Sequence, residues 1–553
     1  KRASRQLAER ALGDVDQAII DRIVDKSEGN AFFLEELLRA AARGDGEALP
    51  GSVLAMVQSR LEALPSQLRR VLRAASVFGL AFFDTGVGVL VGDGVDDRVT
   101  GELLERLVHD ELVVRRPQSR LGGADEYSFR HTLVRDAAYA MLTDEDRKLG
   151  HQLAAAWLAS RGWHEALVVA EHYERGGQPA LAVAGYIKSA AMALDANDFE
   201  AATQRADKGV ACGAADSELG ELLRLKATAG RWAGRAADGE RAGRAALPLL
   251  PRGSTAWWDV VGQIAFTSGV LAEHDKLLEM AQLLCDDRID AATSDHGSAP
   301  ARYVGAANAI VQLNHTGHYN EAQQLLDWTR ERVGDSDDPL LRGWVARAAF
   351  MRAASGVLPG PLLSECAASV EHFRAAGDLR MTCYQRMNLG YANIVTGCYE
   401  RAEDELMTTC HEAEAVQLEH VVSWARSYAC FAIGMQGSSR LTEAEDIAVS
   451  AIQALSKSNN DRMLARAHLY LARVLAYGKQ ADRALAATHE AIELTKALPA
   501  TRALARTVWA MVQLARGESD EALVATEEVL AVLAAHGSVE DGEPLLRTTQ
   551  ADA

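Results

Sequence analysis

One glycine recurs near every fortieth residue over much of the chain, and this spacing constrains the fold more than any other feature. The glycines that share it are Gly230, Gly269, Gly317, Gly356, Gly397, Gly437, Gly478 and Gly517. The last six are separated by 39, 41, 40, 41 and 39 residues, and the first two by 39. Each stands between an apolar segment and one that opens with charged residues and alanine, as in ANIVTGCYERAEDELM. A fixed period of this kind predicts stacked helix pairs joined by glycine turns, an α-solenoid.

Small residues just past these turns support the same interpretation. They are Ala322, Ala402, Ala484 and Ala522, where the second helix of a pair must approach the first closely. The longer interval from Gly269 to Gly317 contains the polar stretch DDRIDAATSDHGSAP, which we interpret as an inserted loop. We expect the solenoid to span residues 151–536 and residues 537–553 to form a disordered tail.

Residues 49–150 lack the repeat and have a different pattern of predicted helices and strands. LPGSVLAMVQSRLEALPSQLRRVLRAASVFG (49–79) predicts two helices, with Pro65 and Ser66 starting the second. Residues 101–142 predict a helix, a strand ELVVRR, a Gly-Gly turn, a strand EYSFR and a closing helix. Helices followed by a small β-hairpin predict a winged-helix-like domain. GVGVLVGDG (86–94) lacks the strand and acidic partner of a dinucleotide loop, and we interpret it as a flexible connection between helices.

Near the front of the chain, SEGNAFFLEELLRA (27–40) predicts a helix that a glycine-asparagine turn opens. Such an entrance usually presents backbone N–H groups to a ligand. Only 26 residues precede it here, too few to complete a nucleotide site. The first residue is lysine and no secretory leader follows, so we expect the chain to be the C-terminal part of a longer protein.

The totals exclude several classes of protein. No run of about 18 uninterrupted apolar residues occurs, because a charged residue breaks every hydrophobic stretch before that length. No membrane span is therefore predicted. Seven scattered cysteines without a C-x-x-C pair predict a reducing cytoplasm and no metal site. A net charge of −19 argues against a nucleic-acid partner. The sequence holds no P-loop, zinc-protease, nucleophile-elbow or protein-kinase motif, so we expect no catalytic centre in this chain.

The order of four phrases carries a resemblance to a known family. EGNAFFLEELLRA, LPGSVLAMVQSRLEALPSQLRRVLRAASVFG, YSFRHTLVRDAAYAML and AEHYERGGQPALAVAGYIKSAAMAL resemble the back half of bacterial STAND-type ATPases, which are signal-transducing relatives of AAA+ proteins. The resemblance covers essentially the whole chain and is most specific over residues 20–190. It implies a mainly α chain with the remnant of an ATPase helical lid (1–48), a winged-helix domain (49–150) and a sensor of repeats similar to tetratricopeptide repeats.

The same resemblance extends to the parent protein. In the family a P-loop ATPase domain precedes the lid. HTLVRDAAYAMLTDEDRKLGHQLAAAWL looks most like the multidomain serine/threonine kinases of myxobacteria-like organisms. The parent is therefore expected to be an ATPase, with a serine/threonine kinase as a further domain. ATP or ADP would bind only together with the upstream domain.

Four residues stand at positions of family motifs that contact nucleotide. The lid motif E-G-N-P-F-F-L-E-E-L aligns Gly29, Asn30 and Ala31 with positions that face the adenine of ADP, and Ala31 stands where the family has proline. The stretch F-R-H-x-L-x-R-D (129–136) resembles the M-H-D motif, with His131 at the position that reaches the β-phosphate and Thr132 in place of the acidic residue. The alternatives are a lid helix that only packs and a histidine that only caps a helix.

These features predict the regulatory and sensing half of a nucleotide-switched signalling protein. The repeats would bind a protein partner or a small-molecule inducer, and activation would bring oligomer formation. One alternative is a helical-repeat scaffold for protein assembly without nucleotide control. A further alternative is a LuxR-like transcription regulator that lacks its helix-turn-helix segment.

Overall fold

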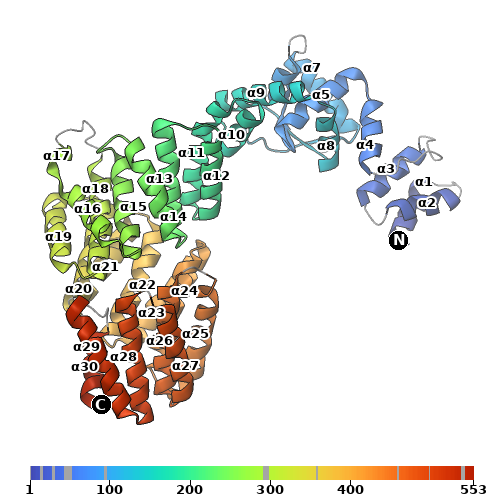
Figure 1. Cartoon of the computed structure of the whole chain (residues 1–553). Coiled ribbons are helices and arrows are strands. Elements are labelled where there is room, and N and C mark those ends of the chain that lie inside the picture. Colours follow the sequence, from blue (N-terminus) through green and yellow to red (C-terminus); the bar gives the residue numbers. More distant parts are fainter. Residues whose placement is uncertain are drawn as a thin grey trace. The chain divides into compact units, whose positions relative to one another are not determined.

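The computed structural model divides the chain into two compact units, Lys1–Lys188 and Ser189–Ala553 (Figure 1). Each unit is described by itself below. The residues that the structure describes are 2–12, 17–27, 31–42, 53–92, 96–290, 298–334, 336–355, 359–457, 460–496, 498–536 and 542–553.

Three helices begin the first unit and share a small core. They are α1 (Arg2–Leu12), α2 (Gln17–Ser27) and α3 (Ala31–Ala42). Apolar side chains at helical spacing meet in this core, and Ile23 and Leu37 are fully buried there. The helix predicted near residues 27–40 is therefore confirmed, with its first residue at Ala31.

A small sheet with surrounding helices follows; we call residues 53–140 the sheet module. Its elements are α4 (Val53–Glu62), α5 (Ser66–Phe78), β1 (Ala81–Phe83), α6 (Asp84–Val91), α7 (Asp97–His109), β2 (Val113–Arg115), β3 (Glu126–Phe129) and α8 (Thr132–Ala140). The strand order is β1-β3-β2, antiparallel throughout, with Val113 opposite Phe129 and Phe82 opposite Tyr127. The two predicted strands and the helices α4 and α5 are confirmed. Strand β1 was not predicted.

The interpretation of residues 86–94 as a flexible connection is wrong for the part that the structure describes. Residues 84–91 form helix α6, and Gly86 is buried within it. A Cβ at Gly86 would lie 2.9 Å from the Phe78 ring and 3.2 Å from the Trp157 ring. Glycine is needed here because the helix backbone packs directly on two aromatic rings.

The first unit also extends further than the predicted boundary at residue 150. Helices α9 (Asp144–Ser160) and α10 (Ala166–Arg175) belong to it, and α11 (Pro179–Asp195) crosses into the second unit. Gly150 packs on Val77, where a Cβ would lie 3.0 Å from a methyl group. The rings of Phe78 and Trp157 meet edge to face at 5.8 Å. These contacts tie α9 to α5, so the solenoid begins later than predicted.

The second unit is the predicted solenoid. Its helices are α12 (Phe199–Ala211), α13 (Asp216–Trp232), α14 (Ala236–Ala246), α15 (Thr255–Val270), α16 (His274–Cys285), α17 (Asp287–Asp290), α18 (Ala299–His315), α19 (Tyr319–Val333), α20 (Pro339–Ser355), α21 (Pro359–Ala375), α22 (Leu379–Val395), α23 (Tyr399–Ala415), α24 (Glu419–Gly434), α25 (Leu441–Leu455), α26 (Asp461–Tyr477), α27 (Ala481–Leu494), α28 (Pro499–Arg516), α29 (Ser519–His536) and α30 (Glu543–Asp552). Successive pairs stack side by side (Figure 1). The first helices of neighbouring pairs also pack on each other, as α15 does on α18 and α24 on α26.

Several of the periodic glycines act as predicted. Gly317, Gly397 and Gly517 end helices with φ of 83°, 77° and 84°, a left-handed conformation that favours glycine. Gly356 lies outside the described residues. The predicted small residues past the turns are all fully buried: Ala322, Ala402, Ala484 and Ala522. Close approach of the paired helices is therefore confirmed.

Other periodic glycines were misassigned. Gly230 and Gly269 lie inside α13 and α15, where a Cβ would come within 2.8 Å of Gly239 and 2.4 Å of Gln312. The left-handed turn residue after α15 is Ala272, with φ of 58°. The period was right, but in these copies the glycine serves helix packing rather than the turn.

Ala272 supplies a stability prediction. A left-handed alanine costs about 1 kcal/mol, and Ala272 is exposed, so Ala272→Gly is expected to stabilise the array by about 0.5–1 kcal/mol. Ala531 is also exposed but lies within helix α29, where Ala531→Gly should instead cost about 1 kcal/mol. Urea denaturation of both variants measures the difference. Equal destabilisation by both would contradict the turn assignment.

The predicted disordered tail is wrong for residues 543–552, which form α30. Leu546 is fully buried and shares a small cluster with Ala503 and Val529. Leu545 also packs against the array, and α30 contacts both helices of the last pair, α28 and α29. Residues 537–541 of that prediction lie outside the described residues.

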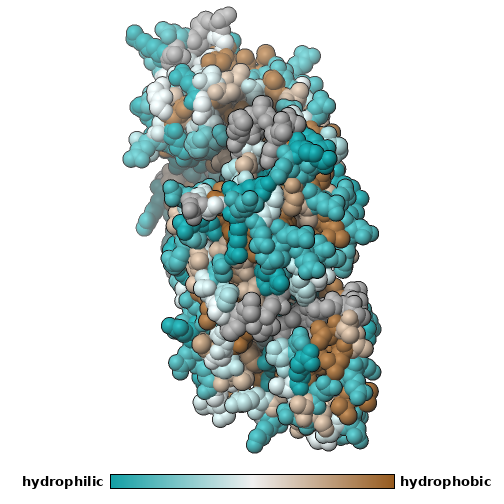
Figure 2. Space-filling model, turned by 90° about the vertical axis from the view of Figure 1, so that its left-hand side faces the viewer, coloured by the Kyte–Doolittle hydropathy of each residue, from teal (hydrophilic) through white to brown (hydrophobic). Residues whose placement is uncertain are grey.

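The face of the molecule drawn in Figure 2 is mostly polar. Hydrophilic residues cover most of the face drawn in Figure 2, with smaller hydrophobic patches between them. Within the described ranges, no helix has both the length and the apolar character needed to cross a bilayer.

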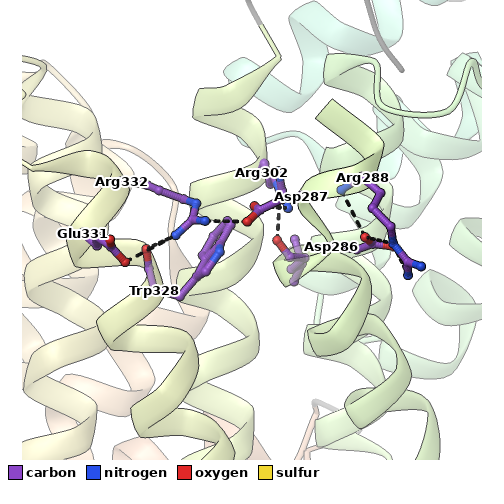
Figure 3. Close-up of polar contacts among 8 residues, drawn as sticks. Asp286, Asp287, Arg288, Arg302, Trp328, Glu331 and Arg332 are labelled. Atoms are coloured by element: carbon purple, nitrogen blue, oxygen red, sulfur yellow. Dashed lines mark hydrogen bonds and ion pairs between the residues drawn. The ribbon is translucent and has the colours of Figure 1, made fainter. Parts of the chain in front are cut away.

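A stack of alternating tryptophans and arginines connects helices α15, α18 and α19 of the array. The Arg302 guanidinium lies 4.7 Å from the ring centres of both Trp258 and Trp328, and Arg332 lies 4.4 Å from Trp328 on α19. Arg302 is 1% exposed and donates from Nε to the Leu284 carbonyl at 2.7 Å. Asp287 lies between the two arginines, 2.6 Å from Arg332 and 3.6 Å from Arg302 (Figure 3). Each cation therefore has both rings and oxygen atoms as neighbours.

Candidate functional site

Of the four residues predicted to contact nucleotide, two lie within the described part of the chain and two lie outside it. Gly29 and Asn30 lie outside the described residues, and Ala31 is the exposed first residue of α3. His131 is the N-cap of α8, and its Nδ1 accepts a hydrogen bond from the Leu133 N–H at 3.1 Å. The capping interpretation of His131 is thus realised. In the neutral ring an accepting Nδ1 puts the proton on Nε2, which makes Nε2 a donor.

Helix α3 and the sheet module meet through four side chains of alternating charge, which we call the α3–sheet network: Glu35, Arg39, Glu111 and Arg130. Arg39 pairs with Glu35 at 2.6 Å and also with Glu111. Arg130 pairs with Glu111 at 3.1 Å and with Glu35 at 3.5 Å. The network joins residues 95 positions apart in the sequence, one turn after Ala31 and immediately before His131.

The network is a weak and reversible connection. Its side chains are 25–49% exposed, and exposed ion pairs contribute only about 0–1 kcal/mol each and are screened by salt. The hydrogen bond from Arg130, followed by the charge of Arg39, lowers the pKa of Glu111 below its usual 4.5. Contacts of this strength hold two elements together without locking them.

The lowered pKa makes the network sensitive to acid. A carboxyl whose pKa is lower in the paired state stabilises pairing above its ordinary pKa of 4.5, and the stabilisation is lost as pH falls through the lowered value. We expect α3 to stay against the sheet module from pH 7 to about 5 and to loosen below that range. Distances between spin labels on α3 and β2 measure this. Glu111→Gln should remove the contribution of Glu111 to the pH dependence of this distance. An unchanged dependence of the distance on pH would contradict the role of Glu111 in the network.

The second charged site lies in the interior of the array; we call it the interior cluster. It comprises Arg231, Trp232, Arg347, Arg380, Tyr384 and His420, from helices α13, α20, α22 and α24. The Trp232 ring lies 6.4 Å from Tyr384 and 6.2 Å from His420. Pairs far apart in the repeat order therefore face each other. The Asn197 amide, which donates to the Val416 carbonyl at 2.9 Å, joins the same parts of the array.

Each guanidinium of the interior cluster lies on aromatic rings. Arg231 is 4.0 Å from the Phe266 ring, and Arg380 is 5.0 Å from Trp232. Arg347, only 3% exposed, is 5.3 Å from Trp344 and 5.6 Å from Tyr384. The cluster is thus a set of cations held by flat apolar surfaces.

Burial lowers the pKa values of the charged groups in the cluster, and repulsion from neighbouring arginines adds to the shift of Arg231. Burial, followed by the charge of Arg347, lowers the pKa of Arg231 to about 9. Burial also lowers the pKa values of Arg347 and Arg380. The pKa of His420 falls to about 4, because of burial and then the charge of Arg380, so this imidazole is neutral at pH 7.

A cavity adjoins the cluster at the turns of the array. Its volume is about 540 Å³, and its lining residues are Asn197, Asp198, Phe199, Glu200, Ala233, Arg235 and Glu419. Phe199 is shared, since the Arg380 guanidinium lies 5.6 Å from its ring. A cavity of this size accommodates a small molecule or a few residues of a peptide.

Two cysteine thiols in the array are unreactive at neutral pH. Burial raises the pKa of the Cys383 and Cys410 thiols to about 11, so they stay protonated at neutral pH. In the part of the chain that the structure describes, no group of three His, Cys, Asp or Glu side chains could hold a metal ion.

Comparison with known proteins gives similarity to solved structures alone. No family model matches the sequence, and no curated protein matches it. A STAND protein with a tetratricopeptide repeat sensor from Pyrococcus horikoshii aligns with 99% of this chain and 74% of its own, at 12% identity and a TM-score of 0.44.

Two further solved structures align with part of the chain. NprR in complex with its cognate peptide NprX covers 53% of this chain and 82% of its own, at 9% identity and a TM-score of 0.41. A Rap protein complexed with competence and sporulation factor covers 61% of this chain and 99% of its own, at 10% identity and a TM-score of 0.37. All three TM-scores are below 0.5, and the proposals below rest on the residues of this chain.

Proposed function

We propose that this chain is the regulatory and sensing half of a nucleotide-dependent signalling switch. Helix α3 and the sheet module would close over an ATP or ADP that a preceding P-loop domain holds. Gly29, Asn30 and Ala31 would face the adenine, and His131 would reach the β-phosphate. The array would bind a protein or small-molecule partner that shifts the balance between closed and open states.

The α3–sheet network is the observation that carries the nucleotide part of this proposal. It joins Glu35, one turn into α3, to Arg130, the residue before His131, so an ion pair connects the two segments that carry the motifs. An imidazole whose Nδ1 is used by the helix cap donates from Nε2, which suits a phosphate oxygen. The weak ion pairs allow the surface to open.

The array would act through differential binding. A ligand shifts a two-state equilibrium only by as much as it prefers one state, and 1.4 kcal/mol corresponds to about a tenfold change. The ion pairs of the α3–sheet network contribute about 0–1 kcal/mol each, so a ligand that prefers one state by about 1.4 kcal/mol provides enough free energy to break one of them. A ligand in the array could therefore control closure without contacting the nucleotide.

Hydrogen exchange tests the clamp directly. The sample is the longer protein in which a P-loop domain precedes this chain, studied with ADP and without nucleotide. We expect ADP to slow amide exchange in α3 and in residues 126–135, because the clamp closes on it. The α28–α29 pair of the array is the internal control and should not change. Equal exchange in α3 with and without ADP would contradict the clamp.

A scaffold for protein assembly is the second candidate. The array forms a compact unit separate from the first, which is the property that a scaffold needs. The two candidates differ in the exchange experiment, since a scaffold predicts no response of α3 to nucleotide.

A further inference from the structure

Three arginines share the interior of the array, and the carboxylates near them, Asp259 for Arg231 and Asp195 and Asp378 for Arg380, act without forming an ion pair. Among the residues that the structure describes, no acidic side chain forms an ion pair with Arg231, Arg347 or Arg380. Asp259 lies close enough to Arg231 to oppose the lowering of its pKa, but it is paired with Arg224 at 2.6 Å. The interior cluster therefore carries excess positive charge in a chain whose net charge is −19.

Arg231 and Arg347 differ in how their N–H groups are satisfied. Arg231 donates to Gln263 Oε1 at 3.2 Å and to Asn308 Oδ1 at 2.9 Å. The Nε and Nη1 atoms of Arg347 have no hydrogen-bond partner within the described part of the chain, although the side chain is 3% exposed. A buried cation with unused donors costs several kcal/mol unless something compensates it. Rings at 5.3 and 5.6 Å offset only part of that cost.

We propose that the interior cluster binds a ligand that bears an oxyanion. Arg231, Arg347 and Arg380 would hold the anionic group, and Trp232, Tyr384 and His420 would pack against the rest of the ligand. This proposal rests on the proposed function, because it names the class of ligand that the sensing array would bind. The anionic group is a carboxylate or a phosphate, carried by a small molecule or by an acidic peptide.

The chemistry of the cluster fits such a ligand. Guanidinium groups present forked N–H donors that match carboxylate and phosphate oxygens, and a charge-assisted hydrogen bond is about twice as strong as a neutral one. An anion would also remove the repulsion between Arg231 and Arg347. Trp232, Tyr384 and His420 are only partly buried, so their rings offer surface to the apolar part of a ligand. The adjoining cavity of about 540 Å³ has Asp198, Glu200 and Glu419 in its lining, so it offers space to the uncharged part of the ligand and not to the oxyanion.

Binding to the full chain in the absence of nucleotide tests the proposal. The probes are benzoate, its neutral analogue benzamide, inorganic phosphate and a hexapeptide of glutamate, each titrated by calorimetry. Benzoate or phosphate is expected to bind, and benzamide is expected to bind at least about tenfold more weakly. Tighter binding of the hexapeptide than of benzoate assigns the source to acidic peptides; tighter binding of benzoate or phosphate assigns it to small molecules. No binding by any anion would overturn the proposal.

Arg347→Met is the test variant, because methionine keeps much of the volume and removes the charge. Anion affinity is expected to fall at least about tenfold. Arg374→Met is the control, since Arg374 is exposed on α21 and paired with Glu371 at 2.6 Å, and it should bind as the unaltered chain does. Removing a buried uncompensated charge should leave the melting temperature without ligand unchanged or higher. A lower melting temperature together with unchanged anion binding would give Arg347 a structural role and overturn the proposal.

Arg380→Met provides an independent variant at a less buried position and should also weaken anion binding. Failure of this proposal is distinguishable from failure of the clamp. Anion binding is measured without nucleotide, and the exchange response of α3 to ADP is measured without anion.

Discussion

Replacing Arg302 by alanine is expected to lower the free energy of unfolding of the array by about 3–5 kcal/mol. Arg302 is 1% exposed and sits between the rings of Trp258 and Trp328. Alanine would leave both rings facing an empty space and would deprive the Leu284 carbonyl of its donor. Both losses add to the cost.

Two further substitutions separate charge from packing at this site. Arg302→Met refills the space between the rings with a flexible thioether and should cost only about 1–2 kcal/mol. Arg288→Ala is the control, because its side chain is 90% exposed and pairs only locally with Asp286, and it should not change stability measurably. Urea denaturation provides the values. A loss below 1 kcal/mol for Arg302→Ala would show that the stack does not hold the helices together.

Arg302 and Arg347 are both buried arginines, yet opposite results are expected for them. Arg302 donates to the Leu284 carbonyl, lies near Asp287 and has two rings as neighbours, so removing it takes away several contacts at once. Arg347 has two unused donors and no ion pair in the described structure, so removing it relieves a cost. The comparison separates a structural cation from one that a ligand completes.

The sequence predicts the array well because its period follows from helix-pair geometry. A pair of helices with two turns occupies about 40 residues, and close approach of the helices requires small residues such as Ala322 and Ala402. The same glycine signal cannot distinguish a turn from a close helix crossing, since both exclude a side chain. Gly230 and Gly269 were misassigned for this reason.

Helix α6 and the tail helix α30 were missed because long-range packing decides them. Three glycines between residues 86 and 92 weaken any local helix signal, and only the neighbouring rings of Phe78 and Trp157 explain Gly86. In the tail, the burial of Leu546 against Ala503 and Val529 depends on residues from the preceding helix pair. Local helix propensity does not depend on packing partners that are distant in the sequence, so it does not predict these two helices.

The two candidate sites differ in how far the sequence reveals them. His131 was found from a motif, and its N-cap role was one of two interpretations that the sequence left open. The interior cluster was not predicted from the sequence. Its arginines come from helices of different repeats and lie at different positions along those helices. No regular spacing in the sequence therefore links them. Only the superhelical arrangement brings Trp232 to Tyr384 and His420.

In the longer protein, His131→Ala is expected to accelerate ADP release by about 10- to 100-fold. One hydrogen bond to a charged group contributes about 1.5–3 kcal/mol, and each 1.4 kcal/mol is about a factor of ten. Alanine also removes the cap that accepts from Leu133, which alone would cost about 1 kcal/mol of stability. A second substitution is needed to separate these two effects.

His131→Asn makes that separation, because asparagine is a good N-cap but has no imidazole Nε2–H in the same place. The control is His109→Ala, at the exposed end of α7. The decisive measurement is the rate of release of fluorescent ADP from these variants. The nucleotide clamp predicts that His131→Asn and His131→Ala both release ADP at least about tenfold faster while His109→Ala does not change. Release from His131→Asn at the unaltered rate would make His131 a helix cap only and would contradict the clamp.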